Sequence, residues 1–294
     1  GKPKTFKLSK AGMIQSAKDT TEYFNLKPGD KALLCLPVDY IAGKMMIVRA
    51  LIAGLNLFYE PPSSNPDLSQ YQKIHFSAMV PMQVEHTLSQ PGFENIETLI
   101  IGGSKVSNAL AARLKQSKTQ CYETYGMAET YAHVALRKIN GTSPDPNFEA
   151  LPGISFDTDH RGCLVVHANR PGKSIITNDL VEIIDSRHFI LLGRYDNVIN
   201  TGGVKVTPEE LENKLSSLID YDFAIIGLPD KTLGEAVTLA IETDQPVDKE
   251  KLHRRSAEIL SKFQVPKKIV TLATFPRNDS YKIDRKKLRK LLQS

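Results

Sequence analysis

Acidic, basic and glycine residues gather between positions 191 and 211, in the segment LLGRYDNVINTGGVKVTPEEL. An apolar strand end runs into Arg194 and the acid Asp196, and the pair Gly202-Gly203 follows beside Lys205. Charged groups at this spacing can hold one another or a charged ligand, and glycines allow a close approach to the backbone. We interpret the segment as a junction between two domains, with polar groups at the interface between them. A surface loop is the alternative, and it is the better interpretation of the glycine pair alone.

A helix is predicted directly after this junction, over residues 208–218. Thr207 suits the N-cap, and Pro208 suits the first helical position, where no partner for a backbone N–H is needed. Glu210 would close a capping box with Thr207. A strand, a polar junction and a capped helix therefore follow one another here.

Two further segments place ionisable groups beside glycine or hydroxyl residues. Residues 124–130 read TYGMAET, and residues 278–285 read NDSYKIDR. Together with 191–211, and in this order along the chain, they resemble the motifs of the adenylate-forming superfamily. This superfamily contains acyl-CoA synthetases, peptide-synthetase adenylation domains and luciferases. The resemblance rests on these residues as they stand, and neither composition nor periodicity shows it.

The resemblance implies a fold of two parts. Residues 1–195 would form an α/β large domain, with a parallel sheet plus a small antiparallel sheet, and 196–294 a small, mobile α+β lid domain. The first four residues, 1–4, look like the tail of a phosphate loop, so the N-terminal part of the large domain would lie before them. A basic tail is the alternative interpretation of these four residues.

The resemblance also implies roles in nucleotide binding. Forming an acyl adenylate joins a carboxylate to the α-phosphorus of ATP, so the site must neutralise charge and position two anions. Glu129 would hold Mg²⁺, which prefers carboxylate oxygens, although taken alone it reads as a solvated loop acid. Thr130 would contact the phosphates, and Tyr125 would frame the adenine. The remaining nucleotide contacts implied are Gly102, Gly103, Ser104, Thr124 and Gly126.

Asp179 stands where the superfamily has an acid that binds the two ribose hydroxyls, with Arg194 as its partner cation. Asn178 replaces the usual glycine before this acid. Asparagine tolerates a left-handed backbone better than most residues, so the turn expected here can still form. An Asx-type turn without a ligand is the alternative.

Lys282 matches the superfamily's catalytic lysine. Its compact charge on a flexible stem would bridge the α-phosphate and the attacking carboxylate. Tyr281 stands where the usual glycine is found, so the shape of this loop differs from the common pattern. Membership in the basic stripe 285–287 is the alternative for Lys282.

The resemblance implies a second step as well, in which a thiol replaces the nucleotide. The small domain would turn about the hinge residue Asp196, withdraw Lys282 and bring Gly202-Gly203 to the path of the thiol. Glycines suit this path, because pantetheine must pass close to the backbone. Lys205 would contact CoA phosphates, with a solvent-exposed lysine as the alternative.

The segment 36–51, LPVDYIAGKMMIVRAL, narrows the substrate. It resembles the substrate-pocket helix of the o-succinylbenzoate–CoA ligases of menaquinone biosynthesis. A dicarboxylic acid needs a cation for the carboxylate that does not react, and Lys44 and Arg49 are the candidates, each otherwise a solvated helix residue. Arg49 is preferred, because a guanidinium binds a carboxylate through two hydrogen bonds. Tyr40 is a further substrate-binding candidate, at a position where many relatives carry histidine.

The expected function is therefore that of an AMP-forming acid–thiol ligase that uses ATP, Mg²⁺ and CoA. The alternatives are another aryl- or acyl-CoA synthetase with the same machinery, and a non-catalytic nucleotide-binding remnant. A Ser/Thr/Gly-rich run encoded before Gly1 would favour the enzyme over the remnant. A carrier-charging adenylation domain fits less well, because no carrier-like helical domain follows Lys282.

The composition of the 294 residues is that of a globular protein, with 41% hydrophobic and 24% charged residues and a net charge of +5. Cys35, Cys121 and Cys163 lie far apart, which predicts neither a disulfide framework nor a zinc site and favours a reducing compartment. The chain contains no apolar run of roughly 18 residues and no visible signal peptide, so a cytoplasmic location is expected. The partners expected are a small carboxylic acid, ATP and CoA, without nucleic acid or a membrane span, and a homodimer is left open.

Hydrophobic periodicity predicts strands that alternate with helices, hence a parallel, helix-covered sheet with ligands beyond the strand ends. Gly102-Gly103-Ser104 and Tyr125-Gly126 both follow such strands, so we expect them to meet. The apolar face expected on the helix 41–55 consists of Met45, Met46, Val48, Leu51 and Ile52. The strands expected first are 31–37, 57–59, 76–80 and 98–101, with a second helix over 107–115. The later strands expected are CLVVHA, SIITND, LVEIID and HFILLG, then 223–227, 236–241 and 268–272, with helices over 249–260 and 284–291.

Overall fold

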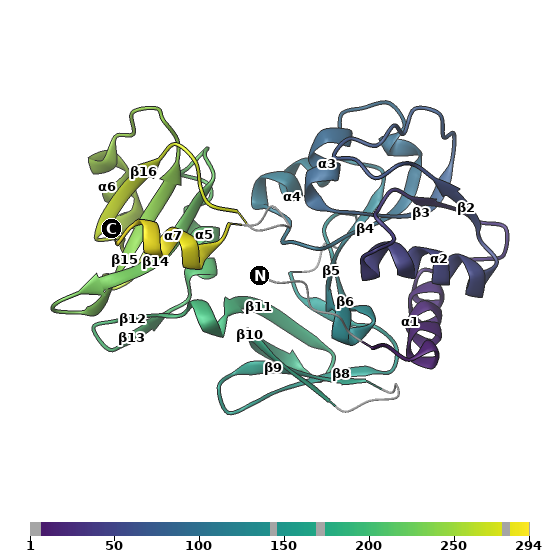
Figure 1. The fold of residues 1–294 in the computed structure, drawn as a ribbon, viewed down its shortest axis with the longest axis horizontal. Coiled ribbons are helices and arrows are strands. Elements are labelled where there is room, and N and C mark those ends of the chain that lie inside the picture. Colours follow the sequence, from purple (N-terminus) through teal and green to yellow (C-terminus); the bar gives the residue numbers. More distant parts are fainter. Residues whose placement is uncertain (1–6, 142–145, 169–173, 278–282, 294) are drawn as a thin grey trace.

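The computed structural model describes residues 7–141, 146–168, 174–277 and 283–293, which form two β-sheets and their helices (Figure 1). The larger sheet has eleven strands in the order β2-β1-β3-β4-β5-β6-β7-β11-β10-β9-β8. Its parallel half consists of β1 (Lys31–Leu34), β2 (Asn56–Tyr59), β3 (Ile74–Met79), β4 (Ile96–Ile101) and β5 (Gln120–Met127). Its antiparallel half consists of β6 (Ala132–Lys138), β7 (Phe148–Ala150), β8 (Ile154–Thr158), β9 (Cys163–Ala168), β10 (Ile175–Asp185) and β11 (His188–Arg194).

The predicted fold class is confirmed, with two corrections. The parallel and antiparallel parts form one mixed sheet rather than two, because β5 pairs with β6 along its edge. The segments SIITND and LVEIID, predicted as two strands, form the single strand β10. Pairing with β9 at one end and with β11 at the other holds this strand together across its register shifts.

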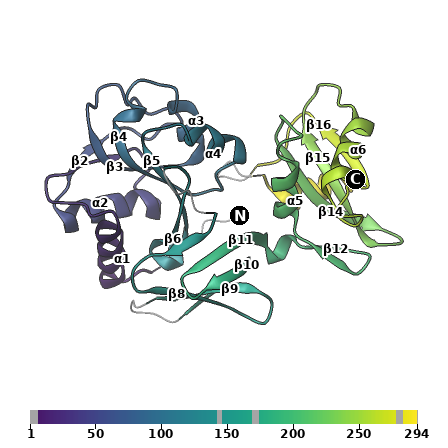
Figure 2. The ribbon, with the colours of Figure 1, turned by 180° about the vertical axis from the view of Figure 1, so that it is seen from behind.

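Helices cover both faces of the parallel strands, as the strand–helix alternation predicts. Successive side chains of a strand point to opposite faces. Leu34 of β1 accordingly packs in a cluster that includes α2 (Ile41–Ala53), and its neighbour Leu33 packs in one that includes α3 (Pro81–Thr87) and α4 (Asn108–Leu114). A helix that the sequence did not predict, α1 (Lys10–Tyr23), packs against α2 and β6 (Figures 1 and 2).

The buried face of α2 differs from the predicted one. Met45 and Met46 are buried as expected, but Leu51 is 77% exposed. Arg49 takes a core-facing place instead and is only 1% exposed. The helix is therefore turned to carry a charged side chain inward, which an apolar periodicity cannot predict. Gly54 ends the helix in the left-handed conformation, as expected of a C-terminal glycine.

The smaller sheet has the strand order β13-β12-β15-β14, with β16 paired to β15. Its strands are β12 (Ile199–Thr201), β13 (Val204–Val206), β14 (Phe223–Asp230), β15 (Gly234–Glu242) and β16 (Lys268–Leu272). Its helices are α5 (Pro208–Leu215), α6 (Lys249–Ile259) and α7 (Arg285–Leu291). The short helix η3 (Tyr195–Asn197) separates the two sheets, and we propose a domain division at residues 195/196.

The start of α5 is partly as predicted. Thr207 stands at the N-cap and Pro208 begins the helix, but the Thr207 side chain makes no capping hydrogen bond. Its methyl group faces Gly193, where an added Cβ would come within 2.5 Å of it. Glu210 forms an ion pair of 2.6 Å with Lys214 instead of closing a capping box, so the capping-box prediction is wrong.

The three cysteines are free and buried. Burial raises the pKa of the Cys35 and Cys121 thiols to about 12. These thiols therefore stay protonated near neutral pH and serve as small apolar groups. No helix in the described part of the chain is both long and apolar enough to cross a membrane.

Candidate active site

A cavity of about 270 Å³ lies at the carboxyl ends of the parallel strands. Open parallel sheets bind ligands at this edge, because loops from several strands converge there. The lining comes from β3, β4 and β5, from the loops after β1, β3 and β4, and from α2 and β6. These residues are Leu36, Ile41, Ala42, Arg49, Ala78, Met79, Val80, Ile100, Gly102, Gly103, Thr124, Gly126, Met127, Ala132 and His133.

The two glycine-containing segments meet at this cavity, as predicted. An added Cβ at Gly102 would lie 2.2 Å from Oγ1 of Thr124, so only glycine allows the loop after β4 to pack this closely against β5. Gly103 has φ of +83°, a conformation that side chains rarely adopt. Ser104 is exposed beside them, and Gly126 lines the cavity from β5.

Among the described residues that line the cavity, Arg49 is the cation. Its guanidinium is buried, and Nη2 lies 3.3 Å from Nδ1 of His133. Lys44 and Tyr40, the other candidates for substrate binding, are not among the lining residues. Nζ of Lys44 donates to the carbonyl of Asp39 at 3.3 Å, and Tyr40 is 66% exposed at the N-cap of α2. Of the three substrate-binding candidates, only Arg49 therefore faces the cavity.

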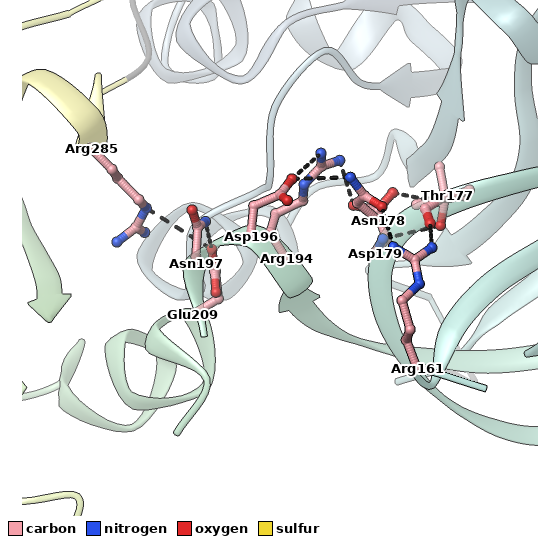
Figure 3. Close-up of polar contacts among 10 residues, drawn as sticks. Arg161, Thr177, Asn178, Asp179, Arg194, Asp196, Asn197, Glu209 and Arg285 are labelled. Carbon is pink, nitrogen blue, oxygen red and sulfur yellow. Dashed lines mark hydrogen bonds and ion pairs between the residues drawn. The ribbon is translucent and has the colours of Figure 1, made fainter. Parts of the chain in front are cut away.

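A chain of polar contacts connects the motif 124–130 to the hinge, and Figure 3 shows its part from Asp179 through Arg194 to Asp196. The Tyr125 hydroxyl donates to Oδ2 of Asp179 at 2.6 Å, and Nη1 of Arg194 donates to Oδ1 at 2.8 Å. The second guanidinium nitrogen of Arg194 lies 3.5 Å from Asp196. Burial first, and then the neighbouring Asp179 charge, raise the pKa of Tyr125 well above its usual range. The phenol therefore stays protonated as a donor to the carboxylate that the sequence assigns to the ribose.

Tyr125→Phe should lower the free energy of unfolding by about 1–3 kcal/mol, because it removes a hydrogen bond to a buried carboxylate oxygen. Tyr122→Phe is the matched control on the same strand: its hydroxyl donates at 3.3 Å to Gln120, whose side chain is exposed. That loss should stay below about 1 kcal/mol. Urea unfolding of both variants makes the comparison, and equal losses would contradict the importance of the Tyr125–Asp179 bond.

Asn178 holds the hinge acid to the large sheet. Its side-chain nitrogen donates to Oδ2 of Asp196 at 3.1 Å, and its oxygen accepts from Arg161 at 2.9 Å (Figure 3). Arg161 also donates to the carbonyl of Thr177 and pairs with Asp159. The left-handed turn expected at this asparagine is absent, because Asn178 lies within β10 and has no positive φ.

Glu129 and Thr130 lie on the short helix η2 (Ala128–Thr130), directly after β5. The Glu129 side chain is exposed, whereas the hydroxyl of Thr130 accepts from Met127 N at 2.9 Å and lies 2.6 Å from the Ala132 carbonyl. This hydroxyl therefore shapes the turn, and its contact with phosphates stays a prediction. The next two residues, Tyr131 and Ala132, have φ of +59° and +91°, which is strained backbone at the edge of the cavity.

The described residues could bind a magnesium ion through a single carboxylate, together with water and the phosphates of a nucleotide. No group of three or more His, Cys, Asp and Glu side chains within the described ranges could hold a metal ion. The exposed Glu129 carboxylate fits the usual magnesium arrangement of one or two carboxylates completed by water and phosphate oxygens.

The glycine pair forms the turn of a β-hairpin on the smaller sheet. Gly202 and Gly203 have φ of +59° and +81° between β12 and β13, as a two-residue turn of type I′ requires. Lys205 is exposed on the same hairpin, outside the lining of the cavity. The predicted catalytic residue Lys282 lies outside the described residues, as do Tyr281 and residues 1–4.

Polar contacts hold α5 of the smaller sheet against the larger one. Nζ of Lys105 donates to the Asn213 side chain, and Asn108 donates to the Ser216 hydroxyl at 2.9 Å. Near the hinge, Asn197 and Glu209 form a hydrogen bond, and Arg285 lies 4.0 Å from the same carboxylate (Figure 3).

Sequence reasoning missed His133, Arg161 and the whole of α1. His133 interrupts an apolar run in β6, AHVAL, and a polar residue inside a buried apolar run is a signal that can be read. Arg161 follows Asp159 in a turn before β9, which resembles any charged loop. The apolar pattern of α1 is weak, and its buried side chains include Ser16, Asp19 and Thr20.

Comparison with known proteins agrees with this geometry. The family described as AMP-binding enzyme matches residues 1–156. A solved structure of an acyl-CoA synthetase (AMP-forming)/AMP-acid ligase II-like protein from Dyadobacter fermentans is 34% identical to this chain. The match has a TM-score of 0.64 and covers 99% of this chain and 86% of that one.

More distant relatives have names that specify one acid substrate. The 2-succinylbenzoate–CoA ligase of Bacillus cytotoxicus is 24% identical over 100% of this chain and 68% of its own length. The o-succinylbenzoate CoA synthetase of Bacillus subtilis has been solved with its acyl-adenylate intermediate, and also with ATP and a magnesium ion. The structure with the intermediate shares the fold at 20% identity and a TM-score of 0.84, over 98% of this chain and 66% of that one.

The matched residues 1–156 make up more than half of the chain, and the 34% identical relative is covered over most of its length. The chain therefore belongs to the AMP-binding enzyme family and, within it, to the AMP-forming acyl-CoA synthetases, which are acid–thiol ligases.

Proposed function

We propose that this chain adenylates o-succinylbenzoate and passes the acyl group to CoA, giving o-succinylbenzoyl-CoA for menaquinone synthesis. The observation that carries the proposal is the buried guanidinium of Arg49 in the cavity at the strand ends. The described lining contains this cation and no carboxylate, and its other members are apolar residues, glycines, Thr124 and His133. Such a lining suits an apolar, aromatic acid with a second anionic group. The distant relatives named for this substrate support the same choice.

In the first half-reaction, the nucleotide would lie along the edge formed by Gly102-Gly103 and Thr124. Each oxygen of Asp179 accepts one hydrogen bond, from Tyr125 or from Arg194. A carboxylate oxygen can accept two, so both ribose hydroxyls can still bind there. Asp179 could therefore bind the ribose while it keeps its hydrogen bonds with Tyr125 and Arg194.

Charge neutralisation would come from two groups. Lys282 would bridge the α-phosphate and the attacking carboxylate, and Glu129 would hold magnesium. When bound, the ion would neutralise charge on the phosphate oxygens. Arg49 would hold the second carboxylate of the acid and leave the first to react.

In the second half-reaction, the smaller sheet and its helices would turn about Asp196. This rotation would break the contacts of Asp196 with Asn178 and Arg194, and those between the 105–108 segment and α5. Gly202-Gly203 would then line the path of the thiol, and the exposed Lys205 would be available to CoA phosphates. All these contacts are polar and solvent-accessible, so the energetic cost of breaking them is small.

We place the protein in the cytoplasm, where ATP and CoA are available and where three free cysteines are stable. The alternative function is that of another aryl- or acyl-CoA synthetase with the same nucleotide site. A synthetase specific for a different acid would differ in the cavity lining and would keep the Asp179 network.

ATP–pyrophosphate exchange tests the substrate directly, because this exchange depends on formation of the adenylate. The exchange should rise when o-succinylbenzoate is added, and it should stay near background with benzoate or a fatty acid. A rise with benzoate or a fatty acid alone would assign the chain to the alternative class of acids.

A further inference from the structure

Arg49 stands at the end of a buried chain of hydrogen bonds that crosses three elements. Its Nη2 lies 3.3 Å from Nδ1 of His133 on β6. On the other side of the ring, Nε2 lies 3.2 Å from the hydroxyl of Thr20 on α1. That hydroxyl lies 3.0 Å from the carbonyl oxygen of Ser16. Arg49, His133 and Thr20 are 1%, 5% and 0% exposed, so water has little access to any of these bonds.

The chain of bonds fixes the tautomer of the imidazole. A carbonyl oxygen can only accept, so the Thr20 hydroxyl donates its hydrogen to Ser16. The hydroxyl oxygen is then the acceptor for Nε2 of His133, which must carry the ring hydrogen. Because a guanidinium can only donate, Nδ1 accepts from Arg49. Every bond of the chain is satisfied when His133 is neutral and protonated on Nε2.

A neutral acceptor orients the guanidinium without neutralising it. A carboxylate at the position of His133 would form an ion pair with Arg49 and would compete with an incoming anion. The imidazole holds Nη2 in place through a lone pair and adds no negative charge beside the guanidinium, which lines the cavity. Two residues of α1 support this arrangement. Thr20 binds the imidazole, and Ser16 donates from its hydroxyl to the carbonyl of Tyr131 at 2.9 Å.

We propose that His133 is a positioning residue, which through Nδ1 aims Arg49 at the non-reacting carboxylate and so sets the preference for dicarboxylic acids. The proposal rests on the proposed function, since it takes Arg49 as the anchor of that carboxylate. Its consequence is selective: binding of a dicarboxylic acid depends on His133, whereas binding of ATP and of an acid with one carboxylate does not.

Variants at His133 separate the two ring nitrogens. His133→Asn keeps a polar acceptor close to the position of Nδ1, His133→Gln reaches towards Nε2 and Thr20, and His133→Leu removes both. Thr20→Val keeps the side-chain shape and removes only the acceptor of the Nε2 hydrogen, so it remains informative if His133→Leu fails to fold. Each variant is assayed by pyrophosphate exchange with o-succinylbenzoate and with 3-benzoylpropionate, which has one carboxylate to react and none to anchor.

His133→Leu should raise KM for o-succinylbenzoate about 10- to 100-fold, the usual effect of losing a hydrogen bond to a charged group. Its kcat, its KM for ATP and its KM for 3-benzoylpropionate should stay within about twofold of the parent values. His133→Asn should recover most of the loss and His133→Gln less of it. Thr20→Val should give a smaller rise in the KM for o-succinylbenzoate alone.

Three results would overturn the proposal. If Arg49→Met raises KM for o-succinylbenzoate and neither His133→Leu nor Thr20→Val does, the proposed function stands and the positioning role fails. If the His133 variants raise KM for both acids and for ATP alike, His133 serves the fold and not the selection of the acid. If Arg49→Met changes KM for neither acid, Arg49 does not anchor the second carboxylate. His133 then has no positioning role.

Discussion

Arg49→Met should raise KM for o-succinylbenzoate about a hundredfold or more, while KM for ATP changes little. Removing one member of a buried charge pair costs roughly 3–5 kcal/mol, because the other charge is left buried without compensation. In the bound complex the charge left behind would be the second carboxylate of the acid. The guanidinium is 1% exposed on the wall of the cavity, so little water can replace it.

Lys44→Met is the matched control for Arg49→Met. Both changes remove a positive charge from α2 and introduce the same side chain, but Lys44 is exposed and does not line the cavity. The control should keep KM for the acid within about twofold of the parent value, as expected for an exposed charge. If Lys44→Met raises KM and Arg49→Met does not, the second carboxylate is held at the start of the helix instead.

Lys282→Ala and Gly203→Leu should have opposite effects on the two half-reactions. Loss of a preorganised charge contact costs about 10²–10³ in rate, so Lys282→Ala should nearly abolish pyrophosphate exchange. It should still convert a supplied acyl adenylate to the thioester. Gly203→Leu should retain the exchange and lose thioester formation, because a side chain there would obstruct the path of the thiol.

A glycine elsewhere in the chain provides the control for backbone strain. Gly203 and Gly29 have φ of +81° and +89°, and an added Cβ meets nothing within 4 Å at either position. Gly29→Leu therefore introduces comparable strain in a turn before β1, far along the chain from the hinge. It should leave both half-reactions intact. If Lys282→Ala and Gly203→Leu lose both half-reactions equally while folded by circular dichroism, the two-conformation account fails.

Most helices and many strands could be predicted from periodicity and end signals, but the strands β6 to β8, β12 and β13 and the helices α1 and α3 were not predicted. The strand over Lys268–Leu272 was predicted with its observed bounds, and α2 ends at Gly54 as expected. The meeting of the Gly102 and Gly126 segments also followed, because parallel strands present their carboxyl ends at one edge. These features depend on local sequence and on one topological rule.

The features that failed depend on tertiary partners. Helical spacing placed Leu51 in the core, whereas the fold turns Arg49 inward to meet His133 on a distant strand. Sequence patterns could propose a capping box at Thr207 but could not show that its methyl group faces Gly193. The role of Asn178 likewise depends on Arg161 and Asp196, which reach it only in the folded chain. Side-chain networks of this kind have no sequence period that would reveal them.

The most direct measurement follows the two products in time by mass spectrometry. The protein is mixed with ATP, magnesium and o-succinylbenzoate, and CoA is added after a delay. The o-succinylbenzoyl adenylate should accumulate before CoA is added and should disappear as o-succinylbenzoyl-CoA forms. Absence of both products from o-succinylbenzoate, with an adenylate and a thioester formed from another acid under the same conditions, would contradict the account.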